Sequence, residues 1–171
     1  SHNYITEDQI GSEIKEIIKI ADYIYGVFGL DYQLTLSTRP QDFMGEIETW
    51  NKAESDLRAV LDELCGKGNY RVNEGDGAFY GPKIDIKMKD CLGREWQMGT
   101  VQLDFQLPMR FGITYVDAEG EKKTPIMIHR AILGSFERFI GIITEHFAGA
   151  FPLRLSPVQV VVAPLTDRNA K

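Results

Sequence analysis

Cysteine is scarce in this chain of 171 residues, since Cys65 and Cys91 are its two cysteines and they form no CxxC pair. Two isolated cysteines exclude a disulfide framework and favour reduced thiols in a reducing compartment. Long hydrophobic runs are also missing, because no apolar stretch approaches the ~20 residues that a membrane-spanning helix needs. The first residues carry no signal-peptide pattern. These absences predict a protein of the cytoplasm or of an organelle matrix, with no membrane partner.

Basic residues are in the minority. Lys and Arg number 19 against 25 Asp and Glu, which gives a net charge of −6 and an isoelectric point near 5.1. Proteins that bind nucleic acid unaided usually carry a basic face. The acidic balance therefore argues against a stand-alone nucleic-acid binder, and it leaves room for an enzyme that touches only the tip of an RNA.

The first third of the chain predicts two helices around a strand. Apolar residues recur at three- and four-residue steps from Thr6 to Phe28, and Thr6 with Gln9 forms a capping-box pattern. Tyr32–Ser37 alternates like a strand. A second helix is expected after Pro40, with an apolar stripe formed by Ile47, Trp50, Leu57, Leu61 and Leu64.

The next part of the chain is rich in predicted strands. Lys83–Lys89 alternates strictly, and its apolar residues are expected on the buried side: Ile84, Ile86 and Met88. A turn at residues 90–94 predicts that Glu95–Phe105 returns antiparallel. A second hairpin is expected to join Ile113–Val116 to Pro125–His129.

A third helix is expected to begin near Gly134 and Ser135, marked by Phe136, Ile140, Ile143 and Phe147. Short hairpin connections make the sheet antiparallel, with helices packed on one side. The predicted fold class is therefore α+β.

A domain boundary is expected at Pro152–Pro157, so residues 1–155 are assigned to this first domain. Beyond it, Val158–Val162 is nearly continuous and β-branched, which is typical of a strand buried on both faces. Residues 156–171 are therefore interpreted as a linker and the first strand of a second domain.

Glycines gather in the segment Glu74-Gly-Asp-Gly-Ala-Phe-Tyr-Gly-Pro-Lys83, which leads straight into a predicted strand. Glycine lets a backbone approach a ligand closely, and a lysine at the mouth of a strand can meet an anion. The segment lacks the GxxxxGK[ST] pattern, which excludes a P-loop. Taken alone, such a loop is more often a plain turn than a ligand loop.

Polar residues interrupt the predicted strand Glu95–Phe105 at Gln97, Thr100, Gln102 and Asp104. A half-solvated sheet face accounts for this pattern without a ligand. However, Gln97 and Gln102 are an odd number of residues apart, so a regular strand would point them to opposite faces. If both serve one site the strand must be irregular, and we predict a bulge near Gly99, because glycine accommodates such a kink.

Two more residues, His129 and Arg138, are candidates for a binding site. His129 follows an apolar strand, where a histidine is usually a satisfied core residue. Arg138 lies in the first turn of the third predicted helix, where the helix dipole disfavours a cation. A bound phosphate would reverse that cost, because the helix N-terminus and the guanidinium both attract anions. A partner carboxylate, Glu137 or Glu145, is the alternative.

Taken in order, these segments resemble the threonyl-tRNA synthetases, a family of class II aminoacyl-tRNA synthetases. The signatures are the Gly-Ala-Phe-Tyr-Gly-Pro-Lys loop that ends at Lys83, the Trp-Gln-x-Gly-Thr-x-Gln-Leu-Asp-Phe strand that ends at Phe105, and His-Arg-Ala-x-Leu-Gly-Ser-x-Glu-Arg-Phe from His129. The last contains class II motif 3. The resemblance covers the whole chain, including Leu36–Pro40 and the start of an anticodon-binding domain at Ser156–Val161.

The resemblance implies a threonine–tRNA ligase, which forms threonyl-adenylate from L-threonine and ATP with Mg²⁺ and then transfers threonine to the 3′ end of tRNA(Thr). It implies that Arg138 binds the γ-phosphate and that Lys83 lies close to the reacting carboxylate and phosphate. The other ATP contacts would be Gln97, Thr100 and Ser135, and the threonine pocket would include Tyr80 and Gln102. The parent protein would be a homodimer.

The resemblance also implies zinc. His129 would ligate a zinc ion that holds the substrate amine and hydroxyl, which distinguishes threonine from the isosteric valine. His2 aligns with a second zinc histidine of the family, although Ser1-His2 could equally be the remnant of a cleaved tag. The zinc cysteine, motif 1 and nearly all of motif 2 would lie upstream of Ser1. The expectation is a catalytic core truncated on its N-terminal side and inactive alone.

An alternative function is a non-catalytic, synthetase-like domain that binds RNA or regulates. A purely structural domain is a third possibility, but it does not explain why four polar segments all match one ligand site. A longer reading frame that supplies motifs 1 and 2 would favour the enzyme.

Overall fold

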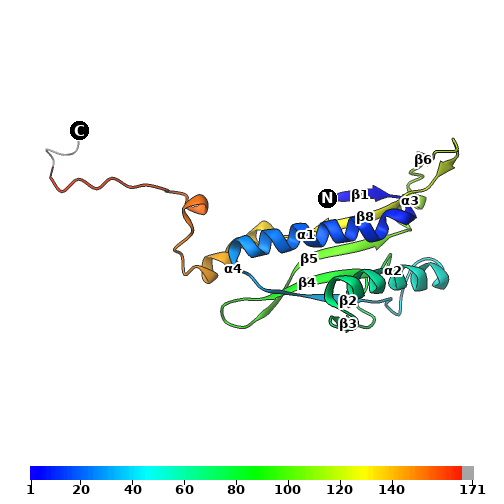
Figure 1. Ribbon diagram of the computed structural model, residues 1–171, viewed down its shortest axis with the longest axis horizontal. Helices are drawn as coiled ribbons and strands as arrows, with labels where there is room; N and C mark the ends of the chain where they lie inside the picture. Colours follow the sequence, from blue (N-terminus) through cyan, green and yellow to red (C-terminus); the bar gives the residue numbers. More distant parts are fainter. Residues whose placement is uncertain (167–171) are drawn as a thin grey trace.

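The main sheet has six strands in the order β1-β8-β5-β4-β2-β3 in the computed structural model, which describes residues 1–166 (Figure 1). They are β1 (His2–Ile5), β8 (Ile126–Ala131), β5 (Glu95–Asp104), β4 (Lys83–Lys89), β2 (Tyr32–Ser37) and β3 (Arg71–Asn73). Neighbouring strands are antiparallel except β2 and β3, which run parallel. The predicted α+β fold is confirmed, with one parallel edge pair that the sequence pattern did not indicate.

The long helices pack on one face of this sheet. Figure 1 shows α1 (Ile10–Phe28) and α2 (Ile47–Cys65) side by side in front of the strands. The short α3 (Leu107–Arg110) follows β5, and α4 (Phe136–His146) adds its apolar face to the same core. The strands contribute Leu34, Leu36, Ile84, Ile86, Val101, Leu103 and Ile128. Burial of each such side chain contributes roughly 1.5–3 kcal/mol, which makes this contact the main term that holds the helices on the sheet.

Local signals set the ends of α1. A 3-10 turn over Glu7–Gln9 precedes the helix, and the Thr6 N–H donates to Oε1 of Gln9 at 3.0 Å. The predicted capping box is therefore present, although the regular helix begins at Ile10 rather than directly after Thr6. Gly29 ends α1 with a φ of 66°, a left-handed conformation that glycine adopts without a Cβ penalty.

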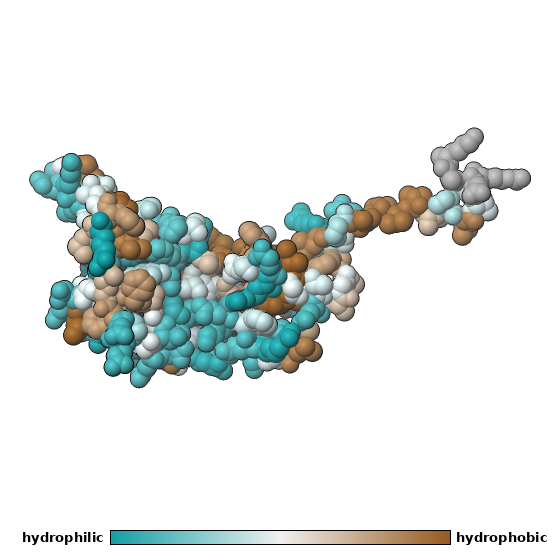
Figure 2. Space-filling view, turned by 180° about the vertical axis from the view of Figure 1, so that it is seen from behind, coloured by the Kyte–Doolittle hydropathy of each residue, from teal (hydrophilic) through white to brown (hydrophobic). Residues whose placement is uncertain are grey.

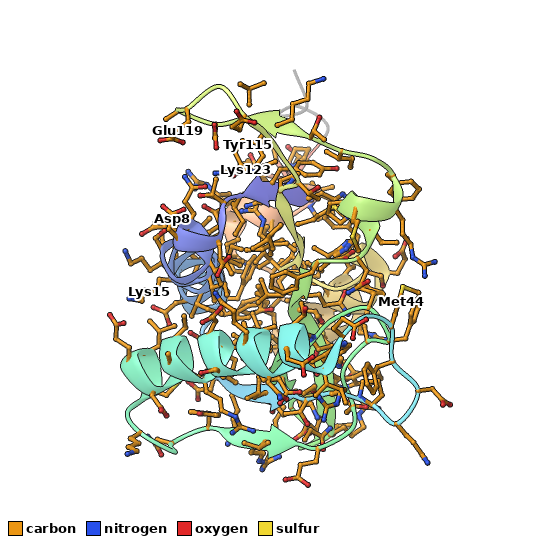
Figure 3. All side chains as sticks on the ribbon, turned by 90° about the vertical axis from the view of Figure 1, so that its right-hand side faces the viewer. Asp8, Lys15, Met44, Tyr115, Glu119 and Lys123 are labelled. Atoms are coloured by element: carbon orange, nitrogen blue, oxygen red, sulfur yellow. The ribbon has the colours of Figure 1, made fainter. Side chains whose placement is uncertain are left out.

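The second predicted hairpin is wrong in its pairing. Tyr115–Val116 (β6) pairs with Lys122–Lys123 (β7) in a separate two-stranded sheet, and Ile126–Ala131 joins the main sheet between β1 and β5. Figure 3 shows Tyr115, Glu119 and Lys123 together on this small hairpin at one end of the molecule. The apolar residues of β8 are buried more completely between two strands than in a short hairpin, which explains the difference.

The apolar stripe predicted for the third helix is also partly wrong. Phe136 and Ile140 are 72% and 54% exposed, and α4 packs against the core through a neighbouring face instead. On that face Phe139 packs edge-on against Phe28 of α1, with ring centroids 5.1 Å apart. Because α4 contacts the core through this face, the face of Phe136 and Ile140 is left to solvent.

The strand predicted at Val158–Val162 is not formed. Val158, Val160, Val161 and Val162 are 66–85% exposed, and this part of the chain leaves the body as an extended apolar segment (Figures 1 and 2). A strand is stable when neighbouring strands pair with it, and among residues 1–166 no segment pairs with these valines. The remaining part of the predicted second domain, residues 167–171, lies outside the described residues. In the described part of the chain, no helix combines the length and apolarity that crossing a membrane requires.

Candidate functional site

Polar side chains gather on the face of the sheet that the helices leave free. The apolar residues of β4 point to the helices, so Lys83 and Asp85 point the other way. Lys83 lies opposite Gln102 of β5, and Asp85 lies opposite Thr100, and residues directly opposite on neighbouring strands share a face. Seen from behind the helices, the surface over the strands is largely hydrophilic (Figure 2). Three of the predicted site residues are thus together on one face.

The irregularity predicted near Gly99 is present. Ile86 pairs with Gly99 and Lys87 pairs with Gln97, so Met98 is the extra residue of a bulge in β5. A Cβ on Gly99 would lie 2.7 Å from Cδ1 of Ile86, which explains why glycine occupies this position. Because of the bulge, Gln97 reaches the same face as Lys87 and the other polar residues.

A buried carboxylate, Asp85, lies at the centre of this polar face, and its side chain is 0% exposed. Its Oδ1 accepts from Nε2 of Gln97 at 2.6 Å and from Oγ1 of Thr100 at 3.4 Å. Its Oδ2 accepts from Nζ of Lys83 at 2.5 Å and from Oγ of Ser37 at 2.7 Å. Nε2 of Gln97 also donates to Oγ1 of Thr100 at 2.9 Å. The carboxylate is thus fully hydrogen-bonded, as a buried charge requires.

Lys83 is held between two carboxylates. Its Nζ lies 2.5 Å from Asp85 and 3.3 Å from Asp76, a residue of the glycine-rich segment. Burial by itself would raise the pKa of Asp76, but the charge of Lys83 and hydrogen bonds from Lys83, Asn73 and Ser37 outweigh it and hold that pKa below its usual value. Lys83 therefore lies on the polar face with its ammonium paired to two carboxylates.

Arg138 lies at the start of α4, on the rim of the same face. Ser135 caps the helix, and its Oγ accepts from the Arg138 backbone N–H at 3.2 Å. The Arg138 side chain is exposed, and its Nη1 donates to the carbonyl oxygen of Gln97 at 3.1 Å. The alternative of a partner carboxylate is not realised among residues 1–166, since Glu145 pairs with Arg94 at 2.6 Å and neither Glu145 nor Glu137 forms an ion pair with Arg138. Its guanidinium is thus available to an anion.

A second buried carboxylate, Asp90, supports the tryptophan beside Arg138. It accepts from Nε1 of Trp96 at 2.8 Å and from Nε of Arg94 at 2.5 Å. Burial by itself would raise the pKa of Asp90, but the hydrogen bonds from Trp96, Arg94 and the backbone of Leu92 and Arg94 outweigh it and lower that pKa to about 2. Asp90 therefore fixes the plane of the Trp96 ring.

The residues predicted to bind threonine and zinc form a second cluster, in which Tyr80 of the loop before β4 meets strands β5, β8 and β1. The hydroxyl of Tyr80 donates to Oε1 of Gln102 at 2.8 Å, and its ring centroid lies 5.3 Å from that of His129. Burial and, secondarily, the negative charge of Asp104 raise the pKa of Tyr80, against the effect of its bond to Gln102. His2 pairs in register with His129, with ring centroids 4.9 Å apart. Four predicted residues are therefore neighbours.

The sequence and the structure both match known proteins. Residues 1–147 match the family model described as tRNA synthetase class II core domain (G, H, P, S and T). This chain belongs to the class II aminoacyl-tRNA synthetases. It is 56% identical over 169 residues to the threonine–tRNA ligase of Symbiobacterium thermophilum and 58% identical over 167 residues to that of Clostridium botulinum (strain Loch Maree). These alignments cover 99% and 98% of this chain, and the chain spans 26% of the length of each relative.

A solved structure agrees with this assignment to the class II synthetases. The RNA binding domain of threonyl-tRNA synthetase from Cryptosporidium parvum Iowa II superposes with a TM-score of 0.85 at 46% identity, over 91% of this chain and 39% of that chain. In this class II synthetase chain, a hollow of about 670 Å³ lies between α1 and β2 and contains none of the predicted site residues. The convergent polar groups on the open sheet face are the better candidate site, because a binding site needs such groups to orient its ligand.

Zinc is the metal that the family resemblance implies for this synthetase. His2 and His129 supply two imidazoles, and Nε2 of His129 lies 2.8 Å from Oδ2 of the buried Asp104, the kind of carboxylate that orients metal-binding histidines. Within residues 1–166, however, no group of three or more His, Cys, Asp or Glu side chains is arranged to hold a metal. A catalytic zinc normally takes three protein ligands, so the described residues do not by themselves make a zinc site.

Several supporting residues of the site were not indicated by the sequence pattern: Asp85, Asp90 and Trp96, with Ser37 and Asp76 around Lys83. Asp85 belongs to the strictly alternating strand, where its side of the strand is normally solvated. The signal that would have found it is the pairing of two strands that each carry several polar residues. When such strands are neighbours, their polar side chains share one face.

Proposed function

We propose that this chain carries the amino-acid activation site of a threonine–tRNA ligase. The activity is ATP-dependent formation of threonyl-adenylate and transfer of threonine to tRNA(Thr), in a homodimeric cytoplasmic protein with Mg²⁺ bound to ATP. One observation carries the proposal: the exposed guanidinium of Arg138 donates a hydrogen bond of 3.1 Å to the backbone carbonyl oxygen of Gln97 at the rim of a polar sheet face. The class II membership and the similarity to threonine–tRNA ligases support it.

The nucleotide would lie along the part of the face near α4. Arg138 would bind the γ-phosphate, because a guanidinium at a helix N-terminus offers both positive charge and directed donors. Gln97 and Thr100 would meet the nucleoside, with Ser135 beside them. Lys83 would stabilise charge near the reacting carboxylate and phosphate, although its pairing with Asp85 at 2.5 Å means that it acts as part of an ion pair.

Threonine would lie over Tyr80 and Gln102, toward His129. The bond between the Tyr80 hydroxyl and Gln102 sets both side chains on one wall. His129 and His2 would be two ligands of the zinc ion, with a third ligand supplied from outside the described residues. When bound, zinc would supply Lewis-acid contacts to the amine and hydroxyl of threonine.

Threonine-dependent exchange of pyrophosphate into ATP tests this function. The product of the complete gene that encodes this chain should catalyse this exchange with threonine. With valine the exchange should be at least about 100-fold slower, because the site would bind the threonine hydroxyl, which valine lacks. Arg138→Leu should lower kcat/KM by about 10²–10³. A protein that binds tRNA(Thr) without any exchange would instead be the non-catalytic binding domain.

A further inference from the structure

We propose that Asp85 is a positioning residue of the nucleotide site: it locks the amide of Gln97 so that Oε1 faces outward as a hydrogen-bond acceptor. The site then selects a donor group of the nucleoside, meaning a ribose hydroxyl or the exocyclic amine of adenine. This inference rests on the proposed function, because it takes the outward side of Gln97 to face ATP.

The amide of Gln97 has its two N–H groups aimed at two acceptors. Nε2 donates to Oδ1 of Asp85 at 2.6 Å and to Oγ1 of Thr100 at 2.9 Å. The hydroxyl of Thr100 lies 3.4 Å from the same Asp85 oxygen and directs its proton there, so Thr100 presents a lone pair to Gln97. Among residues 1–166, no side chain donates to Oε1 of Gln97.

The reversed amide is excluded by chemistry. An ionised carboxylate can only accept hydrogen bonds, so turning the amide over would place Oε1 of Gln97 against Oδ1 of Asp85. Two acceptors in contact repel each other, and the oxygen of the buried Asp85 would be left without this donor. The orientation therefore follows from the identity of Asp85.

Asp85 cannot turn away to relieve that constraint. Its side chain is 0% exposed, and its second oxygen is held by Lys83 at 2.5 Å and by Ser37 at 2.7 Å. One oxygen of the Asp85 carboxylate thus accepts from Gln97 and Thr100, which are predicted to contact the nucleotide, and the other accepts from Lys83 and Ser37.

The outward oxygen complements Arg138. The guanidinium of Arg138 can only donate, which suits phosphate oxygens, and it is held by the backbone carbonyl of Gln97 at 3.1 Å. Oε1 of Gln97 can only accept, which excludes phosphate and suits a hydroxyl or amine. Arg138 would therefore donate hydrogen bonds to the phosphates of a nucleotide, and Gln97 would accept one from its nucleoside.

The substitution Asp85→Asn has a definite expected consequence. Lys83 offers donors and no acceptor, so it takes the single oxygen of the new asparagine and turns the NH₂ toward Gln97. Gln97 must then reverse its amide and present its own NH₂ to the nucleotide. In the double variant Lys83→Met/Asp85→Asn the asparagine oxygen is released, so Gln97 returns to its original orientation.

The experiment compares ATP with 2′-deoxy-ATP, 3′-deoxy-ATP and purine riboside triphosphate, which lack one nucleoside donor each. The readout is kcat/KM in threonine-dependent pyrophosphate exchange with the complete gene product. The wild type should lose about 10-fold or more with one analogue, as expected when a buried acceptor is left unpaired. Gln97→Leu and Asp85→Asn should reduce that ratio to below about threefold, and Lys83→Met/Asp85→Asn should keep it, whatever its absolute rate.

Thr35→Val is the matched control. Thr35 is buried, lies opposite Asp85 on β2, and its Oγ1 makes no hydrogen bond within the described residues. It should keep the wild-type ratio, and thermal unfolding identifies any variant that does not fold.

Three results bear on the inference in different ways. Absence of exchange by the wild type refutes the proposed function itself. Equal use of ATP and all three analogues by an active wild type shows that Gln97 does not meet a nucleoside donor. An unchanged analogue ratio in Asp85→Asn, or a lost ratio in the double variant, overturns the positioning role of Asp85.

Discussion

The guanidinium carbon of Arg138 lies 5.5 Å from the centroid of the Trp96 ring. Arg94 approaches the same ring at 5.7 Å, and the indole N–H is fixed by Asp90 at 2.8 Å. A cation near an aromatic face gains about 0.5–2 kcal/mol, depending on exposure. Trp96 therefore restrains an exposed arginine before any anion arrives.

Replacing this ring should weaken nucleotide binding. In Trp96→Leu, Arg138 loses its restraint, and we expect the KM for ATP to rise about threefold to tenfold, while the KM for threonine stays within about twofold. Steady-state pyrophosphate exchange measures both values. Trp96→Phe keeps an aromatic face and loses the bond to Asp90, so it should have the smaller effect. An equal rise in both variants would assign the role to the Asp90 bond instead of the ring.

Asp90 should make the stability depend on acid pH. Its pKa is lowered from 3.8 to about 2 in the folded protein, so it stabilises the fold above the unfolded pKa and loses this contribution as the pH falls toward 2. Asp90→Asn should therefore be less stable than the wild type near pH 6, with a difference that shrinks between about pH 4 and pH 2. Urea unfolding across this range tests it, and a difference independent of pH would contradict it.

Glycine should be required at position 81 and dispensable at position 141. A Cβ on Gly81 would overlap the backbone carbonyl of Leu103, whereas one on Gly141 of α4 meets nothing within 4 Å. Gly81→Ala should lower the free energy of unfolding by about 3 kcal/mol, which corresponds to a fall in Tm of about 6–12 °C. Gly141→Ala should be neutral or stabilise by up to about 1 kcal/mol, as expected in a helix. Calorimetry of the two variants checks both, and a tolerated Gly81→Ala would mean that the loop can move away from β5.

Zinc should be held weakly by this 171-residue chain. His2 and His129 are neighbours, yet the described residues do not assemble three ligands, and a zinc site with fewer protein ligands is weak. Elemental analysis after dialysis should find far less than one zinc per chain. Stoichiometric zinc that disappears in His129→Ala would show that a further ligand is present.

The extended C-terminal segment should contribute little to stability. Its valines are exposed and make no strand pairs within the described residues, but a β-branched segment with free backbone groups favours association. Deleting the residues after Leu155 should leave Tm within about 2 °C, since surface changes cost little, and should reduce self-association in sedimentation velocity. If the deletion unfolds the protein, the segment belongs to the catalytic core.

The strands that alternate strictly were predictable from the sequence. Lys83–Lys89 has the predicted bounds, and the odd spacing of Gln97 and Gln102 located the bulge, because side-chain direction along a strand is a local property. The pairing of β8 was not predictable, since local turn signals favour a hairpin and long-range pairing depends on burial from other strands. The segment Val158–Val162 has the pattern of a strand, but the described residues supply no partner and no strand forms there.

The polar residues of the candidate site were easier to find from the sequence than the residues that support them. Gln97, Thr100 and Gln102 stand out as polar residues within an apolar strand. Asp85 does not stand out, because an aspartate on the polar side of an alternating strand is ordinarily solvated. Its burial comes from Ser37 on β2 and Gln97 on β5, and neither neighbour can be identified from spacing along the chain.

The bulge at Met98 also determines which deletions β5 can tolerate. Gln97 pairs with Lys87 and Gly99 with Ile86, so removing Met98 would close the ladder with every remaining side chain on its present face. Loss of Gly99 would have the same effect, since Met98 already points to the core side, whereas loss of a residue farther inside β5 would exchange the inner and outer sides for the residues between that point and the bulge. During divergence, a deletion inside this strand is therefore best accommodated at these two positions, and loss of Met98 would empty the space of a methionine that is 2% exposed.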